Sequence, residues 1–281
     1  SYGTLGNQDL GGKFFIPSMP VVSNMYWVTP DNMIAPGIGS PAAVAESISW
    51  EKVKMLNLGT DISLLNNHIG ITLDWYERNT TGMLTTKAVG ATFGTNAPRV
   101  NDGNMRTRGW EIGIDGTYNF GPDLAVYGIA TLADSKSIIT QWDNPSMLLN
   151  QNYAGKTMGE IWGFETDRYF TKDDDMNNKA SVPDQKALAN GNFVYGPGDI
   201  KYKDLNGDSV INGGKVSAND HGDLKVIGNN LPRYQYSFRI GGSWKNFDLD
   251  IFFQGVGKRE LWGWGDVALP LYRGSDIMYD H

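Results

Sequence analysis

One stretch of the chain has the residue types and spacing of a calcium loop. Asp204, Asn206 and Asp208 stand at alternate positions, and Val210 follows them. In such loops, oxygen ligands at the first, third and fifth positions wrap a cation, and a backbone carbonyl follows at the seventh. We therefore predict a Ca²⁺ or Mg²⁺ site in the loop 204–212, with Asp204, Asn206, Asp208 and Val210 as its ligands.

The match to a calcium loop is partial. Ser209 stands at the sixth position, where glycine is usual, and Lys215 stands at the twelfth, where glutamate is usual. Asn212, Asp220 or Asp223 would then complete the ligand shell. The alternative is an Asx-rich turn, in which the same side chains hydrogen-bond to their own backbone.

The rest of the sequence does not predict catalysis. His68, His221 and His281 are scattered and lack the H-x-x-x-H spacing of a zinc site. The chain has no cysteine, which excludes disulfides and thiolate metal sites. It also lacks the G-x-S-x-G elbow, the P-loop and the paired-histidine metalloprotease motif. The acidic run 173–175 indicates a solvated loop tip. We predict that the chain is not an enzyme.

Composition narrows the class of protein. The 281 residues include 35 glycines and 12% aromatics, which favours a β protein with many turns. Tryptophan and tyrosine are also enriched at membrane interfaces, because their rings are apolar in body and polar at the tip. The 24 basic and 31 acidic residues argue against nucleic acid as a partner. No apolar run approaches the ~20 residues of a transmembrane helix.

The elements that must position these residues are strands. Apolar and polar residues alternate with period two in several segments, the pattern of a strand with one apolar and one polar face. These segments come in pairs: 53–65 with 69–78, 108–118 with 124–134, and 233–244 with 247–254. Alternation is clearest in 233–244, whose apolar positions are Tyr234, Tyr236, Phe238, Ile240 and Trp244.

The connections between these strands alternate in length. The turns within the pairs are short, and the remaining segments are long: 79–106, 136–231 and 258–281. Long loops are unusual in a compact soluble domain. An outer-membrane barrel has short turns at one end and long loops at the other.

Aromatic residues fall at both ends of the expected strands. Trp75 and Trp110 lie at the long-loop ends, and Tyr118 and Trp244 lie at the short-turn ends, as two interfacial girdles would require. The sequence therefore predicts an all-β, antiparallel transmembrane barrel. A secreted β-sandwich is the alternative, because it has the same periodicity.

Short motifs occur in a fixed order along nearly the whole chain. They read SYGTLGNQ at 1–8, WEKVK followed by LGTD at 50–61, DWYERNTTGML at 74–84, APR at 97–99, GNMRTRGWE at 103–111, GEIWGF at 159–164, PGDIKYKDLNGD at 197–208, and GN followed by PRYQY at 228–236. Together they resemble the C-terminal barrel portion of the SusC/RagA family of TonB-dependent outer-membrane receptors.

The resemblance implies a fold and a cellular location. Residues 1–281 would be late strands of a barrel of about 22 strands that is closed by a plug. Residues 136–231 would form a long extracellular loop region within it. We expect the plug, the TonB box and the signal peptide to lie outside this sequence. The location implied is a bacterial outer membrane of the Bacteroidota type, in contact with its lipid.

The implied function is active import of large nutrients, with oligosaccharides as the first expectation and peptides, as in RagA-type importers, as the second. A SusD-like surface lipoprotein would form a lid, and the TonB-ExbB-ExbD complex would supply energy through the absent N-terminal region. The aromatic residues of the long loops are candidate contacts to ligand or lid: Trp142, Trp162, Tyr169, Trp262 and Trp264. The alternative for each residue is packing within the loops.

Two rival functions follow from the same pattern. A secreted β-sandwich would be a carbohydrate-binding protein or a glycoside hydrolase, and a hydrolase needs two carboxylates at a fixed separation in a cleft. The loops offer no such constellation. A passive porin would have neither plug nor lid, and the motifs in the long loops argue against it.

Overall fold

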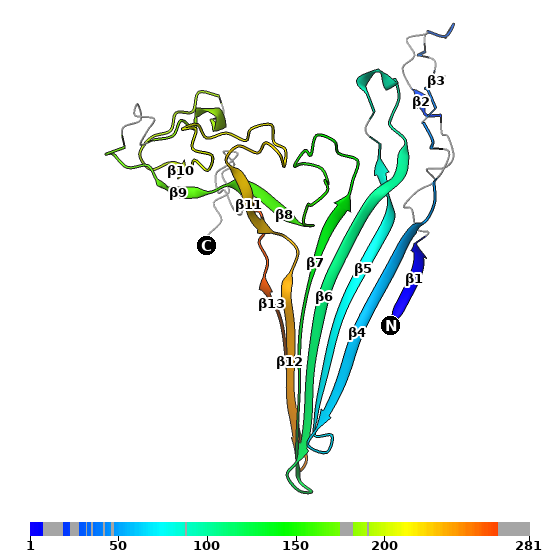
Figure 1. Cartoon of the computed structure of the whole chain (residues 1–281), viewed down its shortest axis with the longest axis vertical. Helices are drawn as coiled ribbons and strands as arrows, with labels where there is room; N and C mark the ends of the chain where they lie inside the picture. The colour runs from blue at the N-terminus through cyan, green and yellow to red at the C-terminus, as the bar shows by residue number, and fades with distance from the viewer. Residues whose placement is uncertain are drawn as a thin grey trace. The chain divides into compact units, whose positions relative to one another are not determined.

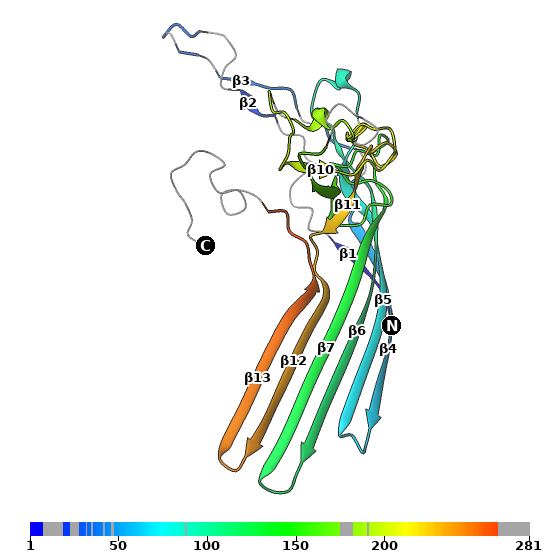
Figure 2. The same ribbon diagram turned by 90° about the vertical axis from the view of Figure 1, so that its left-hand side faces the viewer.

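The computed structural model describes residues 1–7, 19–22, 28–31, 33–34, 36–41, 43–45, 48–87, 89–174, 182–189 and 191–263. Its main element is a seven-stranded sheet with the order β1-β4-β5-β6-β7-β12-β13. The strands of this sheet are β1 (Tyr2–Asn7), β4 (Glu51–Leu64), β5 (Ile69–Thr86), β6 (Arg99–Asn119), β7 (Leu124–Gln141), β12 (Arg233–Trp244) and β13 (Phe247–Lys258). β12 pairs antiparallel with both β7 and β13, and Figures 1 and 2 show β12 and β13 side by side along their length.

The remaining strands are short and pair antiparallel outside the main sheet. They are β2 (Val21–Val22) with β3 (Gly37–Ile38), β8 (Glu160–Phe164) with β11 (Leu224–Asn229), and β9 (Thr166–Tyr169) with β10 (Ile200–Tyr202). Two 3₁₀ turns, η1 (Ala91–Phe93) and η2 (Lys186–Leu188), complete the described elements. In the part of the chain that the structure describes, no helix is both long and apolar enough to cross a membrane.

The chain divides into two compact units. The first comprises Ser1–Thr60, Leu73–Trp110 and Ser135–Thr157, and the second comprises Asp61–Thr72, Glu111–Asp134 and Met158–His281. Among the described residues, the buried hydrophobic side chains of the first unit are Ile139, Leu149 and Tyr153, and those of the second are Phe170, Val182 and Ile211. Of these six, only Ile139 belongs to a strand of the main sheet.

Several strands are longer than the alternation predicts. β5 continues to Thr86, β6 begins at Arg99 and β7 continues to Gln141, so the expected loop 79–106 shrinks to a connection of residues 87–98. The added segments are rich in threonine, asparagine and other polar residues. A search for a hydrophobic period of two misses a strand segment in which polar residues interrupt the alternation.

One of the two expected aromatic girdles is displaced, because β5 and β6 are longer than predicted. Trp75 and Trp110 lie in the interior of β5 and β6 and not at their long-loop ends. Tyr118 and Trp244 lie at the short-turn ends, as predicted. In the turn after β4, Leu65, Asn66 and Asn67 all have positive φ. Asparagine tolerates this left-handed conformation.

The apolar face of β12 and β13 is exposed. Phe238 and Phe253, which are paired in register, stack with ring centroids 4.8 Å apart, yet they are 43% and 52% exposed. Trp244 and Leu249 are exposed by 57% and 65%. A soluble β-sandwich would bury this face in its core. An exposed apolar face of this extent is typical of a surface that meets lipid or protein.

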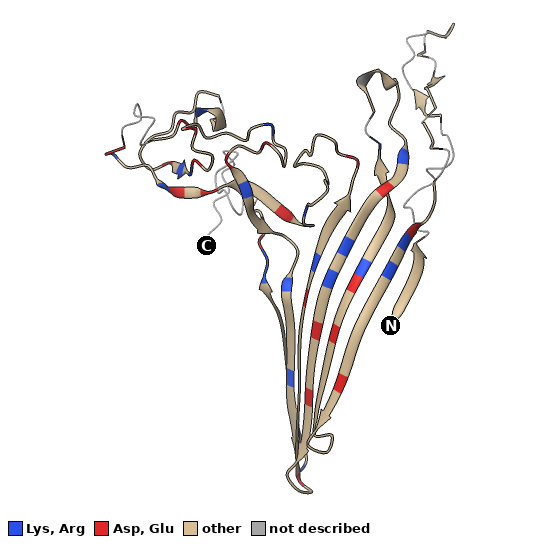
Figure 3. Cartoon of the chain, viewed as in Figure 1, with Lys and Arg blue, Asp and Glu red and all other residues tan. Residues whose placement is uncertain are grey.

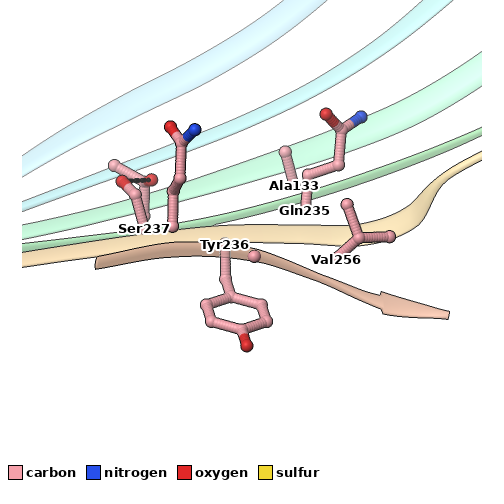
Figure 4. A pocket seen from close by; sticks show the side chains of 8 residues that line it. Ala133, Gln235, Tyr236, Ser237 and Val256 are labelled. Atoms are coloured by element: carbon pink, nitrogen blue, oxygen red, sulfur yellow. Dashed lines mark hydrogen bonds between the residues drawn. The ribbon is translucent and has the colours of Figure 1, made fainter. Parts of the chain in front are cut away.

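The opposite face of the same strands is mainly polar, with Phe252 and Val256 of β13 as apolar exceptions. Figure 4 shows the side chains of Gln235 and Ser237 on one side of β12 and the ring of Tyr236 on the other. Tyr236 lies over Gly255, its register partner on β13. The alternation predicted for β12 is therefore confirmed at Gln235, Tyr236 and Ser237.

Candidate functional site

The polar face of the second unit carries a network that links three adjacent strands. Arg239 on β12 forms an ion pair with Asp250 on β13, with Nη2 2.5 Å from Oδ2. The hydroxyl of Tyr127 on β7 donates to the same carboxylate. Nearby, the hydroxyls of Thr131 and Ser237 share a hydrogen bond of 2.7 Å. These bonds hold charged and hydroxyl groups in defined positions on one side of the sheet.

A second ion pair lies at the start of β12. Arg233, at the start of β12, donates through Nε and Nη2 to both carboxylate oxygens of Asp134 on β7. The backbone N–H of Tyr234 donates to Asp134 Oδ1 at 3.3 Å. Arg233 and Tyr234 belong to the PRYQY motif, so the motif anchors β12 to β7.

The first unit has equivalent polar contacts. Arg108 on β6 pairs with Glu77 on β5 at 2.5 Å, and Asn79 donates to the same glutamate at 2.9 Å. The hydroxyls of Thr107 and Ser137 share a hydrogen bond of 2.8 Å. Figure 3 shows charged residues at intervals along β5 and β6 and not in one block. Thr107 and Arg108 are consecutive residues of β6, so these two contacts lie on opposite faces of the sheet.

Asparagine side chains connect the ends of β5 and β6. Asn101 Nδ2 donates to the carbonyl of Gly82 at 2.6 Å and to that of Ser49 at 2.8 Å, and its Oδ1 accepts the N–H of Ser49 at 2.7 Å. Asn104 Oδ1 accepts the N–H of Gly82 at 3.0 Å. Gly82 has a φ of +70°, a conformation that favours glycine.

Trp142 is held against the sheet and lines a cavity. A Cβ at Gly103 would lie 2.9 Å from Cζ3 of Trp142 and 3.0 Å from Cγ2 of Thr85, so only glycine allows the indole this position. Trp142 borders a cavity of about 570 Å³ in the first unit, together with side chains of the connection after β7, among them Asn150 and Asn152. The structure therefore places this predicted aromatic residue in a pocket.

The other predicted loop aromatics behave differently. Trp162 donates from Nε1 to Glu160 at 2.8 Å, and its ring lies 5.3 Å from that of His221, which fits packing within the loop. Tyr169 and Trp262 are 65% and 59% exposed. Trp264 lies outside the described residues. A role of these side chains in contact with ligand or lid stays a prediction.

The predicted metal loop forms a series of Asx-type hydrogen bonds. Asp204 accepts the N–H of Gly207 at 2.7 Å and that of Ser209 at 2.8 Å. Asn206 accepts from Asp208 N at 3.0 Å, and Asp208 accepts from Val210 N at 2.8 Å. These bonds match the turn that we considered as the alternative.

The fit of a cation to this loop is mixed. The donor set of carboxylates, an amide and a carbonyl is the chemistry that Ca²⁺ or Mg²⁺ requires. Within the described residues, however, no three acidic or histidine side chains gather as a metal cluster. Asp223, considered as a further ligand, is fully buried and accepts the N–H groups of Leu205 at 2.8 Å and Asn212 at 2.9 Å. The metal site stays a prediction.

The two described histidines, His68 and His221, lie in different parts of the second unit. His68 lies at the turn after β4, with Nδ1 3.0 Å from the carbonyl oxygen of Thr117. His221 packs against Trp162, and its Nδ1 is buried without a hydrogen-bond partner among the described residues. His281 lies outside the described part of the chain.

A charged group that the sequence did not reveal joins the short strands of the second unit. Glu165, between β8 and β9, accepts from Lys203 Nζ at 2.6 Å, and it also accepts from Lys225 on β11. Lys203 directly follows β10. Hydrogen bonds from Lys203 and then Lys225 lower the pKa of Glu165 to about 2. No spacing rule could have found this group, because Glu165 and Lys225 lie 60 residues apart.

The acidic run 173–175, expected to be a solvated tip, differs from residue to residue. Asp173 is exposed as expected, and Asp175 lies outside the described residues. For Asp174 the prediction is wrong, because it forms a double hydrogen bond with Arg168, at 2.7 and 2.6 Å. The guanidinium of Arg168 and the N–H of Thr171 hold the pKa of Asp174 well below its usual range. The ion pair with Arg168, six residues earlier, therefore fixes Asp174 within the loop.

Known proteins resemble this chain in sequence and in fold. No family model matches it. Two TonB-dependent receptors of Formosa agariphila are 23% and 24% identical to it over 269 and 290 residues, and each alignment covers 90% of this chain and 25% of the relative. The chain thus spans about a quarter of the length of the curated relatives that it matches.

Solved structures also resemble this chain, in their fold. The RagAB peptide transporter superposes with a TM-score of 0.65 at 20% identity, over 90% of this chain and 25% of that chain. The RagAB peptide importer in its open-open state also gives 0.65 at 20% identity, over 91% and 25%. The fold is therefore that of antiparallel barrel strands of a TonB-dependent receptor, and the β-sandwich alternative is wrong. The resemblance to SusC/RagA-type receptors, first seen in the motifs, is confirmed.

Proposed function

We propose that this chain forms part of an outer-membrane transporter that actively imports large nutrients. The observation that carries the proposal is the difference between the two faces of β12 and β13. One face exposes rings such as Phe238 and Phe253, and the other holds Arg239 and Asp250 in an ion pair. An apolar outside and a polar inside are what a barrel in lipid requires. The similarity to TonB-dependent receptors supports the same function.

The transporter would work with partners. A SusD-like surface lipoprotein would cover the barrel, and the TonB-ExbB-ExbD complex would supply energy through a region outside this sequence. The segment 136–231 would be extracellular and would contact lid and ligand. Its short strands support this role, because Glu165 and Asp223 tie them into an ordered body suited to forming a surface.

The substrate would be an oligosaccharide. The polar cavity beside Trp142 supports this choice. A peptide is the second candidate, because the similar solved structures are of a peptide transporter. The relatives are named receptors and transporters, which supports a protein that is not an enzyme.

The test is a pull-down of the whole receptor from native outer membranes, followed by mass spectrometry. We expect a SusD-like lipoprotein at close to one copy per receptor. Recovery of the receptor from the soluble fraction, or from the membrane without any such lipoprotein, would overturn the proposal. A membrane protein without a lid would favour a passive porin instead.

A further inference from the structure

One face of β5 and β6 in the first unit changes from apolar to charged along the strands. Leu73, Trp75 and Glu77 alternate on β5 and therefore share a face. On β6, Trp110 shares a face with Arg108 for the same reason. Arg108 Nε lies 2.5 Å from Oε2 of Glu77, so both strands turn this face to the same side of the sheet. The charged residues lie toward the longer connections.

Lys136 on β7 stands next to Arg108 on this face. The hydroxyls of Thr107 and Ser137 share a hydrogen bond of 2.8 Å on the opposite face, which makes their chain neighbours Arg108 and Lys136 adjacent. Figure 3 shows basic segments of β6 and β7 next to each other. Arg106 also belongs to this face, about 7 Å along β6 from Arg108. Arg106, Arg108 and Lys136 are called the basic cluster below.

The positive charge of the basic cluster is only partly neutralised. Glu77 pairs with Arg108 and also accepts from Asn79 at 2.9 Å. Arg106 and Lys136 form no hydrogen bond or ion pair with other described residues. Like charges that stand opposite each other on neighbouring strands destabilise a sheet. An anion between the three side chains would remove this repulsion.

The basic cluster lies just beyond the expected apolar band. Trp75 is 38% exposed, and exposed tryptophan is typical of a membrane interface. Trp110 and Tyr118 are eight positions apart on β6, which is about 26 Å of strand. At a tilt of ~40° this length covers about 20 Å, close to the ~25 Å apolar band of a barrel. Arg108 follows Trp110 on the side of the longer connections and would therefore lie at the level of lipid headgroups.

We propose that the basic cluster binds the phosphate of a lipid in the outer leaflet. The guanidinium forks of Arg106 and Arg108 match phosphate geometry, and the ammonium of Lys136 adds a third donor group. The acyl chains would lie against the apolar residues of the same face, Leu73 and Trp75. A lipid is favoured over a free anion because the basic cluster adjoins this apolar surface directly. The inference rests on the proposed function, since it requires a barrel in a membrane.

The test is native mass spectrometry of the whole receptor in detergent, titrated with a lipid A that carries one phosphate. The same lipid without its phosphate should bind at least tenfold more weakly. Arg106→Gln and Lys136→Gln should each weaken binding of the phosphorylated lipid about tenfold, because each removes a charged donor. Arg78→Gln is the matched control. Arg78 is an exposed cation next to Glu77 on β5, but its side chain belongs to the opposite face.

Thermal unfolding of the lipid-free receptor separates binding from stability. Lys136→Gln should not lower the unfolding midpoint, because it removes a like-charge contact with Arg108. A lower midpoint would show that Lys136 stabilises the sheet and would contradict an unsatisfied basic cluster.

Three results would overturn the lipid site. They are equal affinity for the lipid with and without phosphate, an equal loss of binding in Arg78→Gln and Lys136→Gln, and displacement of the lipid by millimolar inorganic phosphate. The last result would assign the basic cluster to a free anion. Each of these outcomes leaves the import function intact if the receptor still co-purifies from outer membranes with its lipoprotein. Recovery of the receptor from the soluble fraction would refute both proposals.

Discussion

Tyr127 on β7 lies directly over Gly241 on β12, its partner in the antiparallel register. A Cβ at position 241 would lie 2.5 Å from the hydroxyl of Tyr127 and 2.8 Å from the carbonyl of Leu249. The glycine lets the tyrosine lie flat across one strand and reach Asp250 on the next. Because Gly241 on β12 has no side chain, the hydroxyl of Tyr127 can lie over β13.

Gly241→Ala should therefore destabilise the sheet. We expect a loss of about 1–3 kcal/mol in the free energy of unfolding, the usual cost of overpacking, because the ring must leave its place and the bond to Asp250 breaks. Urea unfolding of the whole receptor in detergent measures this loss. Gly113→Ala is the matched control, since a Cβ there would meet only Thr72 Cβ at 3.8 Å. Equal midpoints for the two variants would contradict the prediction.

The ion pair between Arg233 and Asp134 should matter more than the pair between Arg108 and Glu77. The side chain of Asp134 is 7% exposed, whereas that of Arg108 is 55% exposed. Arg233→Met leaves a buried carboxylate without its guanidinium and should cost about 2 kcal/mol or more in the free energy of unfolding. Arg108→Met should cost less than about 1 kcal/mol.

The same urea experiment on both variants compares the two pairs. Adding Asp134→Asn to Arg233→Met should recover part of the loss, because it removes the stranded charge. A double variant less stable than Arg233→Met alone would show that Asp134 acts mainly through other contacts.

The loops of the second unit should loosen in acid. The pKa of Glu165 is lowered to about 2, chiefly by Lys203 and then by Lys225, while an unfolded glutamate titrates near ~4.3. The stabilisation is therefore fully present above the unfolded pKa and is lost as the pH falls through the folded one. We expect protease cleavage within 160–229 to rise between about pH 4 and pH 2.

Glu165→Gln separates this effect from general acid denaturation. The variant should be cleaved more readily at neutral pH and should respond less to acid over the same range. An acid-stable protease such as pepsin suits the low-pH arm. An unchanged acid response in Glu165→Gln would assign the effect to another carboxylate, for which Asp174 is the next candidate.

Calcium should protect the loop 204–212 if the metal prediction holds. We expect millimolar Ca²⁺ to slow protease cleavage near this loop, chelation to reverse the effect, and Asp208→Asn to weaken it, because a carboxylate ligand is lost. If the loop resists protease cleavage equally with calcium and with chelator, the result would support the Asx-turn alternative. Asp123→Asn, in a distant short turn, controls for a general effect of charge.

The strands that could be predicted from the sequence are those with one apolar face. The bounds of 233–244 agree with β12 because Phe238 and Ile240 alternate with Arg239 and Gly241 along its length. The ends of β5, β6 and β7 next to the longer connections were missed, because polar residues interrupt the apolar alternation there. The short strands β8 to β11 were missed as well, since a strand of three to six residues carries too little pattern.

The sequence alone determined that this is an all-β chain of alternating strands and that its motifs resemble one receptor family, because periodicity and motifs are properties of neighbouring residues. Only the tertiary structure decided which residues far apart in the sequence are in contact. Glu165 accepts a hydrogen bond from Lys225, Trp142 packs against Gly103, and Tyr127 lies over Gly241. Trp142 also lines the same cavity as Asn150. Local sequence patterns cannot predict contacts over such separations. The register of the strands and the closure of the loops determine these contacts, and both depend on pairing between strands far apart in the chain.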